Sequence, residues 1–542
     1  MHRCQCRKSS PTSRRILIRW LQLRRMRASS LIVLILFSGI GARSQSRSNE
    51  SQPSVVTELG QFVPEQLEKW KVPGLAIAVV QNGRVIYEHG FGLRNVKRNL
   101  PVTTKTIFPV GSISKSFTAL SMGILNDEGR LEWDKPVRQY LPEFQMYDPV
   151  ASERMTPRDL ISHRVGMAGH DLVWYSSDFS REDLVRRLRF LQSNRDFRSG
   201  YHYNNLLVMT AGYLVGRVAG QSWEDFIRLQ VFEPLGMVSC NFSIAESEKS
   251  SDFSLPYKKD ETTGNVSEIP FHAIASIGPA GSINSNVEDM ARYAIFQLGK
   301  GKVGDRQLVS EANLGLNHTP QVPMPDRLRP PEIGPRSYGM GWVISSYRGH
   351  ALWWHNGGID GFYALLALLP DENFGVVILT NLLGDDPVPE IVSYRLFDRL
   401  LGLSPVDWNK YYEEIDKKEK AAAEGEHKEE LAEHKADTQP SHQLEDYIGR
   451  YENPGYGTFS IARTGNGLKA MLNQLSFELR HYEYDIFESP SDSTGSIDIG
   501  KLRFLSDMDG EINAIATPLE PEAPEILFTR VREKPSPQQQ KP

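Results

Sequence analysis

A serine and a lysine three positions apart, Ser112 and Lys115, begin a stretch whose apolar residues continue to Leu120. Residues three apart on a helix lie about one turn away on the same face, so the lysine amine can reach the serine hydroxyl. Burial penalises a charged amine and the positive end of a helix acts in the same direction, so Lys115 can work as a neutral base. The spacing therefore predicts a helix from Ser112 to about Asp127 with an activated serine in its first turn.

Two further short motifs follow this one along the chain. Tyr203-Asn204-Asn205 leads into an apolar stretch, and His355-Asn356-Gly357-Gly358 follows a strand-like run. Alone, the S-x-x-K spacing arises by chance roughly once or twice in a chain of this length. Each motif also has a structural interpretation: a polar turn on a core helix, a core tyrosine, or a hydrogen-bonded histidine at a strand end. The order of the three motifs favours catalysis.

In these motifs the chain resembles the serine β-lactamase and penicillin-binding protein superfamily, specifically the class C-like branch of DD-carboxypeptidases, D-aminopeptidases and carboxylesterases. The resemblance covers about residues 55–403 and includes these flanking segments: Val72-Pro73-Gly74, Asp134 to Val137, Tyr140-Leu141-Pro142, Thr156 to His163, Phe232 to Met237 and Pro279 to Ile283. It implies an α/β (α+β) fold, with an antiparallel sheet flanked by helices and a mostly helical inserted domain. The active site is expected at the junction of the two.

The resemblance also implies catalytic roles. Ser112 would be the nucleophile, Lys115 its proton acceptor, and Tyr203 a second general base or acid. A phenol has a pKa of about 10, so Tyr203 needs a nearby cation such as Lys115 to become a base. These three residues are the predicted catalytic set.

The same resemblance implies a substrate-binding set. Asn205 would donate to the substrate amide, and the backbone N–H of Gly358 would stabilise the oxyanion beside that of Ser112. His355 and Gly357 stand where lactamases and most penicillin-binding proteins carry Lys-Thr-Gly or Lys-Ser-Gly. A histidine of ordinary pKa is mostly neutral at pH 7, so it attracts a substrate carboxylate less than lysine does.

These residues predict a serine hydrolase that acts through an acyl-enzyme on amide or ester bonds, either D-amino-acid-containing peptides or small esters. β-Lactam hydrolysis is the alternative within the same chemistry. A different class of function is a weak or inactive binder of peptidoglycan fragments, or a scaffold. A base placed next to a serine favours an enzyme, because binding alone needs no base.

Composition limits the choice of partners. The formal net charge of -5 argues against a nucleic-acid binder, and the 40% hydrophobic content is sufficient for one large core and a smaller one. Beyond the leader the chain has one cysteine, Cys240, so no internal disulfide is expected in a mature form. No motif indicates a metal or a cofactor, since the spacing of His427 and His434 fits a solvated helix face. The expected partner is a small-molecule or peptide substrate, and the sequence does not indicate an oligomeric state.

Residues 1–45 resemble a signal peptide or an N-terminal anchor. Several arginines precede the apolar run from Leu31 to Phe37, and small residues follow it. This run is short for a bilayer span, so export to the periplasm or the outside is expected, with a membrane anchor as the alternative. Met26 is an alternative start.

Outside the motifs, the pattern predicts a hairpin from Val72 to Tyr87 and a change of composition after Leu403. Residues 404–443 are rich in Glu, Lys and Ala and are expected to form a charged helical or flexible linker. Residues 444–533 contain short alternating segments between turns, which predict a small antiparallel β domain, with a lipocalin-like barrel as a candidate. The tail, 534–542, is expected to be disordered.

Overall fold

The computed structural model describes residues 52–260, 263–272, 274–325, 329–383, 386–465, 467–489, 499–520 and 523–532. The expected leader and the expected disordered tail lie outside these ranges. Within them, no helix has both the length and the apolar character that crossing a bilayer requires.

The central element is a nine-stranded sheet in the order β10-β11-β12-β13-β14-β15-β1-β2-β3, and its paired strands are antiparallel. The predicted hairpin is confirmed as β1 (Gly74–Gln81) and β2 (Arg84–Asn95). Its turn residues Asn82 and Gly83 both have positive φ, 51° and 73°, as a type I′ turn requires. The other strands of the sheet are β3 (Leu100–Pro101), β10 (Val322–Pro323), β11 (Ser337–Tyr338), β12 (Val343–Tyr347), β13 (His350–Ile359), β14 (Phe362–Leu369) and β15 (Phe374–Thr380).

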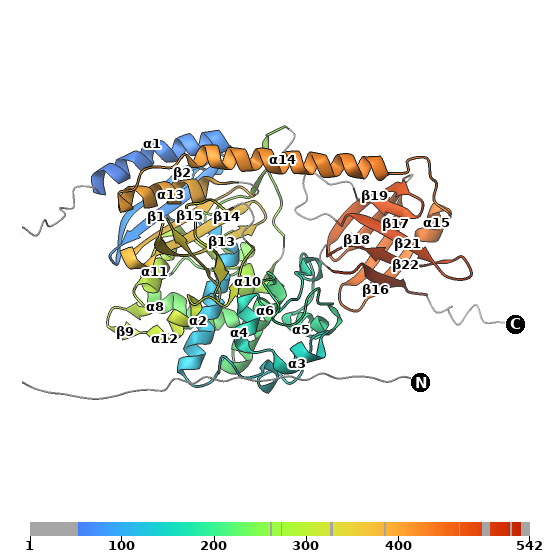
Figure 1. Ribbon diagram of the computed structural model, residues 1–542, viewed down its shortest axis with the longest axis horizontal. Coiled ribbons are helices and arrows are strands. Elements are labelled where there is room, and N and C mark those ends of the chain that lie inside the picture. The colour runs from blue at the N-terminus through green and yellow to red at the C-terminus, as the bar shows by residue number, and fades with distance from the viewer. Residues whose placement is uncertain are drawn as a thin grey trace, which may run out of the picture. The chain divides into compact units, whose positions relative to one another are not determined.

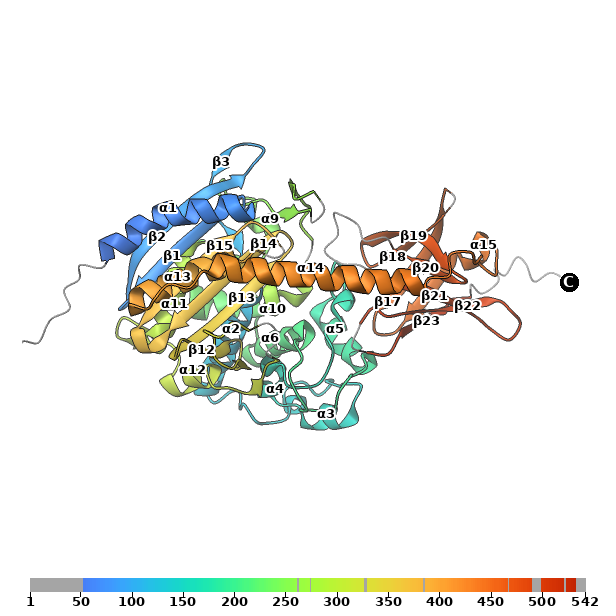
Figure 2. The same cartoon turned by 45° about the horizontal axis from the view of Figure 1, so that its top comes forward.

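Successive residues of β1 are buried on opposite faces of the sheet. Leu75, Ile77 and Val79 join a core formed with α1 (Gln52–Trp70) and α13 (Val388–Leu401). The small residues between them on β1 join the main core on the opposite face. Figures 1 and 2 show α1 and α13 side by side over the first face, and Figure 1 shows α2 and α11 beyond the second. Because the sheet is covered on both faces, its central strands are almost entirely buried.

The chain between β4 and β7 is mostly helical, and its core helices are α2 (Ser114–Asp127) and α6 (Asn205–Ala219). The remaining α-helices up to the sheet's last strands are α3 (Pro149–Arg154), α4 (Pro157–Ser162), α5 (Arg181–Arg187), α7 (Trp223–Ile227), α8 (Glu233–Leu235), α9 (Ile244–Ser247), α10 (Gly278–Gly281), α11 (Val287–Leu298) and α12 (Glu311–Asn317). This arrangement confirms the predicted antiparallel sheet flanked by helices with a mostly helical insertion.

Short elements connect these parts. The 3-10 helices are η1 (Gly111–Ile113), η2 (Val137–Gln139), η3 (Asp171–Val173), η4 (Leu188–Phe190), η6 (Ala275–Ile277) and η7 (Pro370–Glu372), and η5 (Arg228–Phe232) is a π-helix. The two-stranded pairs are β4 (Phe108–Pro109) with β7 (Asn284–Ser285), β5 (Tyr257–Lys259) with β6 (Val266–Glu268), and β8 (Lys302–Val303) with β9 (Arg306–Gln307).

The C-terminal β domain is a closed barrel of eight strands that follow one another in chain order. This confirms the predicted small antiparallel β domain. Its strands are β16 (Gly449–Asn453), β17 (Gly457–Thr464), β18 (Gly467–Leu472), β19 (Leu475–Glu483), β20 (Ile486–Glu488), β21 (Lys501–Ser506), β22 (Ile512–Thr517) and β23 (Ile526–Arg530). Much of the expected linker forms the 26-residue helix α14 (Trp408–Glu433), and the short α15 (Leu444–Tyr447) precedes the barrel.

Candidate active site

Ser112 lies in η1, between strand β4 and helix α2. The predicted helix therefore begins as a 3-10 turn and becomes α-helical at Ser114, and it ends at Asp127 as expected. The Ser112 Oγ atom lies 2.9 Å from the Nζ atom of Lys115 and 2.6 Å from the hydroxyl oxygen of Tyr203. The structure thus brings the three predicted catalytic side chains together around one oxygen atom.

Lys115 is fully buried, and each of its three possible donors has an acceptor. Its Nζ atom lies 2.9 Å from Ser112 Oγ, 2.8 Å from Asn205 Oδ1 and 2.8 Å from the Ala280 carbonyl oxygen. Burial lowers the pKa of Lys115 to about 7, and the negative charge of Asp171 opposes this shift. Near neutral pH a large part of the lysine is therefore an amine. Such an amine can donate to the two carbonyl oxygens and accept the serine proton.

Tyr203 immediately precedes α6, whose N-cap is Asn204. The Asn204 side chain accepts from the backbone N–H of Leu207 at 2.8 Å, which holds this turn and the tyrosine before it. Burial raises the pKa of Tyr203 well above its usual range, although Lys115 Nζ lies 4.7 Å from its ring centroid. The sequence led us to expect that Lys115 lowers the pKa of Tyr203. In the structure this pKa is raised instead, because desolvation is the larger effect. In the free protein Tyr203 is a proton donor to Ser112 rather than a base.

Both the oxygen and the nitrogen of the Asn205 side-chain amide form hydrogen bonds. Its Oδ1 accepts from Lys115, and its Nδ2 donates to Asp171 Oδ1 at 3.1 Å. Asp171 begins η3 and also accepts from the indole N–H of Trp174 at 2.7 Å. The expected donation from Asn205 to a substrate amide would therefore compete with Asp171, a residue that the motifs did not indicate.

We expect Asp171→Asn to move the acid limb of the pH profile of kcat/KM to lower pH. The negative charge of Asp171 raises the pKa of Lys115, so its removal makes the amine easier to deprotonate, while the new amide oxygen can still accept from Asn205. The matched control is Asp178→Asn in the same segment, where the carboxylate accepts from Gln474 Nε2 at 2.6 Å. A limb that moves to higher pH, or that moves equally in both variants, would contradict the assignment of Lys115 as the base.

The His355-Asn356-Gly357 motif lies on strand β13, which includes the strand-like run before it and continues to Ile359. This strand pairs with β14 as far as Ile359, whereas its pairing with β12 stops at Trp354. No strand in the described part of the chain pairs with the other edge of residues 355–359. That edge can bind an extended substrate through main-chain hydrogen bonds.

Gly357 allows β13 to approach the serine turn closely. A Cβ atom at Gly357 would lie 2.0 Å from the Val110 carbonyl oxygen and 2.9 Å from the Ser112 nitrogen, which no side chain can tolerate. Gly111 has a φ of 52°, and a Cβ there would lie 3.3 Å from the Gly358 nitrogen. The backbones that carry the two expected oxyanion donors, Ser112 and Gly358, are thus in contact.

His355 is buried and neutral. Its Nδ1 lies 2.5 Å from the Asn356 carbonyl oxygen and must donate to it, so its Nε2 accepts from the Tyr338 hydroxyl at 2.9 Å. Burial lowers the pKa of His355 to about 3, and the charge of Lys115 acts in the same direction. The position of the lactamase lysine therefore carries no positive charge at neutral pH.

Two aromatic neighbours of the site were not among the predicted residues. The His163 ring lies 4.4 Å from the ring of Tyr203 and 4.4 Å from that of Tyr338, measured between centroids. His163 Nδ1 accepts from the Asn204 backbone N–H at 3.2 Å. His163 ends one of the flanking segments of the resemblance, which was the available signal, whereas nothing local singles out Tyr338. His163 thus packs against Tyr203 and Tyr338, and Tyr338 in turn contacts His355.

The segment around Asp171 also contacts the C-terminal barrel. Nδ1 of His170 lies 2.8 Å from the Tyr456 hydroxyl, and the His170 backbone N–H donates to the Glu520 carboxylate at 2.7 Å. The barrel thus holds the residue next to Asp171. Among the described residues, no three His, Cys, Asp or Glu side chains converge in a way that would hold a metal ion.

Comparison with known families agrees with this geometry. Residues 59–399 match the Beta-lactamase family, which is more than half of the chain, so the chain belongs to that family. This confirms the resemblance to the serine β-lactamase and penicillin-binding protein superfamily. Residues 433–530 match a domain of unknown function, DUF3471.

Curated relatives include two proteins named unguisins hydrolase. The one from Aspergillus campestris is 29% identical over 70% of this chain and 72% of its own length, and the one from Aspergillus violaceofuscus is 28% identical over 65% and 66%. Protein flp from Staphylococcus aureus is 25% identical over 64% of this chain and 66% of its own. Hydrolases are therefore among the relatives of this chain.

Two solved structures share the fold. The octameric penicillin-binding protein homologue from Pyrococcus abyssi is 23% identical with a TM-score of 0.58, and the match covers 88% of this chain and 100% of that one. The structure of SurE with D-Leu is 18% identical with a TM-score of 0.51, over 89% and 100%.

Proposed function

We propose that this protein is a serine hydrolase that cleaves amide or ester bonds through an acyl-enzyme on Ser112. The observation that carries the proposal is the position of Ser112 Oγ, 2.9 Å from a buried lysine amine and 2.6 Å from a tyrosine hydroxyl. A lysine pKa of about 7 provides a base at physiological pH without a histidine. Binding alone does not need this arrangement, because burying a lysine costs stability and a base beside a serine serves catalysis.

In the first half of the reaction, Lys115 takes the hydroxyl proton while Ser112 Oγ bonds to the substrate carbonyl carbon. The oxyanion accepts hydrogen bonds from the backbone N–H groups of Ser112 and Gly358. When the bond to the leaving group breaks, Tyr203 gives that group its proton and takes one from the protonated Lys115, whose Nζ atom lies 4.7 Å from the tyrosine ring centroid. The products of this half are an ester on Ser112 and a free amine or alcohol.

In the second half, water replaces the leaving group and the proton transfers run in reverse. The site regenerates the Ser112 hydroxyl and releases a carboxylic acid. Both halves use the same acid and base, so their geometry is required twice in each turnover.

For the substrate, we propose D-amino-acid-containing peptides or small esters rather than β-lactams. The support is His355, which is neutral and hydrogen-bonded to Tyr338, and therefore offers no fixed charge to the carboxylate of a penicillin. The relatives named unguisins hydrolase support hydrolysis rather than binding alone.

The test is intact-protein mass spectrometry after incubation with p-nitrophenyl acetate, a D-alanine anilide or benzylpenicillin, with Ser112→Ala as the control. We expect turnover of the ester or the anilide, slow acylation by penicillin, and no adduct on the control. Rapid, stoichiometric penicillin acylation followed by turnover would instead make this protein a β-lactamase. No adduct and no turnover with any of the three would overturn the proposed enzyme.

A further inference from the structure

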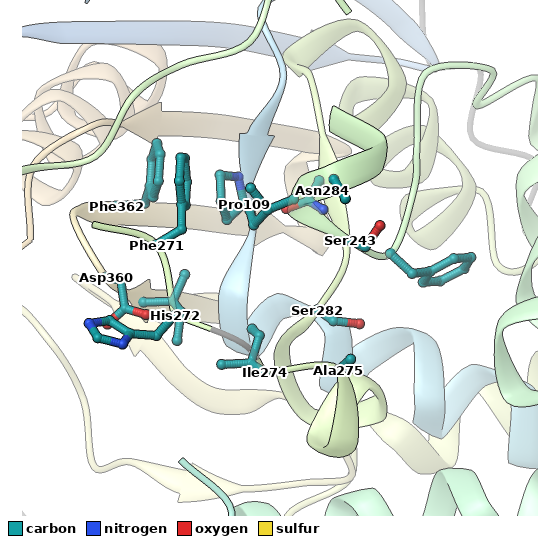
Figure 3. Close-up of a pocket in the computed structure, with 14 residues that line it drawn as sticks. Pro109, Ser243, Phe271, His272, Ile274, Ala275, Ser282, Asn284, Asp360 and Phe362 are labelled. Atoms are coloured by element: carbon teal, nitrogen blue, oxygen red, sulfur yellow. The ribbon is translucent and has the colours of Figure 1, made fainter. Parts of the chain in front are cut away.

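A cavity of about 320 Å³ with mostly apolar walls is lined in part by Pro109, Ser282 and Ile359, which are close in the chain to residues of the catalytic centre. Its apolar lining includes Phe242, Ile244, Phe271, Ile274, Ile359 and Phe362. Figure 3 shows the rings of Phe271 and Phe362 next to each other at one end, and their centroids are 6.0 Å apart at 19°. A volume of this size is within the range of small-molecule sites and has room for a phenyl ring or a chain of about eight carbons.

Three segments that line the cavity also carry parts of the catalytic centre. Pro109 ends strand β4, three residues before Ser112. Ser282 follows α10, whose Ala280 carbonyl accepts from the buried lysine. Ile359 directly follows Gly358 on β13. The cavity is therefore adjacent to the point where the substrate carbonyl would lie, on the side of the second oxyanion donor.

The direction of the reaction decides which half of the substrate this cavity faces. The proton donor for the leaving group, Tyr203, packs against His163, and neither of these residues lines the cavity. A leaving group that takes its proton there has to depart on that side. The acyl half stays bonded to Ser112 and extends past Gly358 toward Ile359, where the cavity begins.

The polar groups at the cavity have partners and do not favour an anion. The Asp360 carboxylate is 5% exposed and accepts from the Tyr175 hydroxyl at 2.6 Å. His272 Nδ1 lies 3.1 Å from Ser176 Oγ, and Figure 3 shows the His272 and Asp360 side chains close together. A second carboxylate in this space would be repelled by Asp360, whereas an apolar group would be accommodated.

We propose that this cavity binds the acyl group of the substrate and selects uncharged, apolar acyl groups that contain an aromatic ring or a medium-length chain. The inference rests on the proposed acyl-enzyme and adds the substrate class to it. Burying each additional methylene should raise kcat/KM about threefold to fourfold until the cavity is full.

The experiment compares p-nitrophenyl acetate, butyrate and hexanoate, together with the mono-p-nitrophenyl ester of adipic acid. We expect kcat/KM to rise about 100-fold from acetate to hexanoate, and to fall at least about tenfold from hexanoate to the adipate monoester because of its carboxylate. A flat series, or an adipate monoester as good as the hexanoate, would overturn the assignment of the cavity.

Two variants fill the cavity from different segments: Ile274→Trp and Ile244→Trp. In each, the ratio of kcat/KM for hexanoate to that for acetate should fall below about tenfold, because the added ring occupies the volume. Val238→Trp is the matched control, since Val238 is 88% exposed and does not line the cavity, and its ratio should equal that of the parent. Thermal unfolding of each variant checks that it is folded. Parental ratios in both folded filling variants would contradict the proposal.

Binding to the Ser112→Ala protein separates this proposal from the proposed function. Isothermal titration calorimetry with hexanoyl and acetyl esters should show tighter binding of the hexanoyl ester and a negative heat-capacity change. Suppose that no ester is hydrolysed in a Ser112-dependent way, but the hexanoyl ester still binds and Ile274→Trp abolishes that binding. This result would support the cavity as a binding site for apolar groups and contradict the proposed serine hydrolase. Ser112-dependent hydrolysis without a preference for longer acyl groups would support the proposed hydrolase and contradict the proposed role of the cavity.

Discussion

Replacing Ser112 with alanine is expected to lower kcat/KM by at least about 10⁴-fold toward any hydrolysed substrate, because the acyl-enzyme cannot form without Oγ. The side chain is only partly buried and makes two hydrogen bonds, so the protein should stay folded. Steady-state hydrolysis of p-nitrophenyl acetate measures the first effect, and thermal unfolding measures the second.

The matched control is Ser121→Ala, which removes another serine hydroxyl from the same helical region. Ser121 is fully buried and donates to the Thr118 carbonyl oxygen at 2.7 Å, away from the three motifs. Its loss should change stability slightly and activity little. Parental activity in Ser112→Ala would rule out the mechanism.

Lys115→Met and Tyr203→Phe are each expected to lower kcat by about 10² to 10⁴, the usual range for loss of acid or base catalysis. The pH dependence distinguishes them. In the parent, kcat/KM should fall as pH drops below about 7, because only the neutral amine of Lys115 accepts the serine proton. Tyr203→Phe should keep this acid limb, and Lys115→Met should lose it. Pre-steady-state and steady-state rates between pH 5 and 9 provide the measurement.

An acid limb near pH 7 that survives in Lys115→Met would contradict the assignment of this residue. His355 cannot produce such a limb, since its pKa is lowered to about 3, and His163 is likewise lowered well below its usual range by burial. Unlike these two histidines, Lys115 has a pKa that matches the expected profile.

Local patterns predicted the parts of the protein whose structure depends on neighbours in the chain. The Asn82-Gly83 turn between two β-rich runs specified the first hairpin, and the apolar spacing after Ser112 specified α2, with Asp127 as its last residue. The alternating segments after residue 444 predicted a β domain. Two of its strands carry weak local signals, β20 because it has three residues, and β16 because only Tyr451 among its five residues is buried. Tyr451 is buried in the barrel core.

The protonation states of the site residues and the closure of the barrel depended instead on contacts between segments that are distant in the chain. Burial is the largest cause of the raised pKa of Tyr203, and Asp171 acts on Lys115 because η3 contacts the start of α6 through Asn205. The barrel closes through pairing of β16 with β23, which are separated by most of the domain. Such contacts join residues far apart in the chain, so no local spacing encodes them.

The sequence by itself determined the family, the sheet with its helical insertion, and the order of the three motifs that meet at Ser112. The family and its fold follow from the resemblance that the three motifs carry, whereas the first hairpin and α2 follow from turn chemistry and periodicity, which act over a few residues. Only the tertiary structure decided that Tyr203 is a proton donor, that His355 is neutral, and that an apolar cavity lies beyond Gly358. The reason is that desolvation and cavity shape arise from packing of segments that are separate in the chain, and packing is a property of the folded chain.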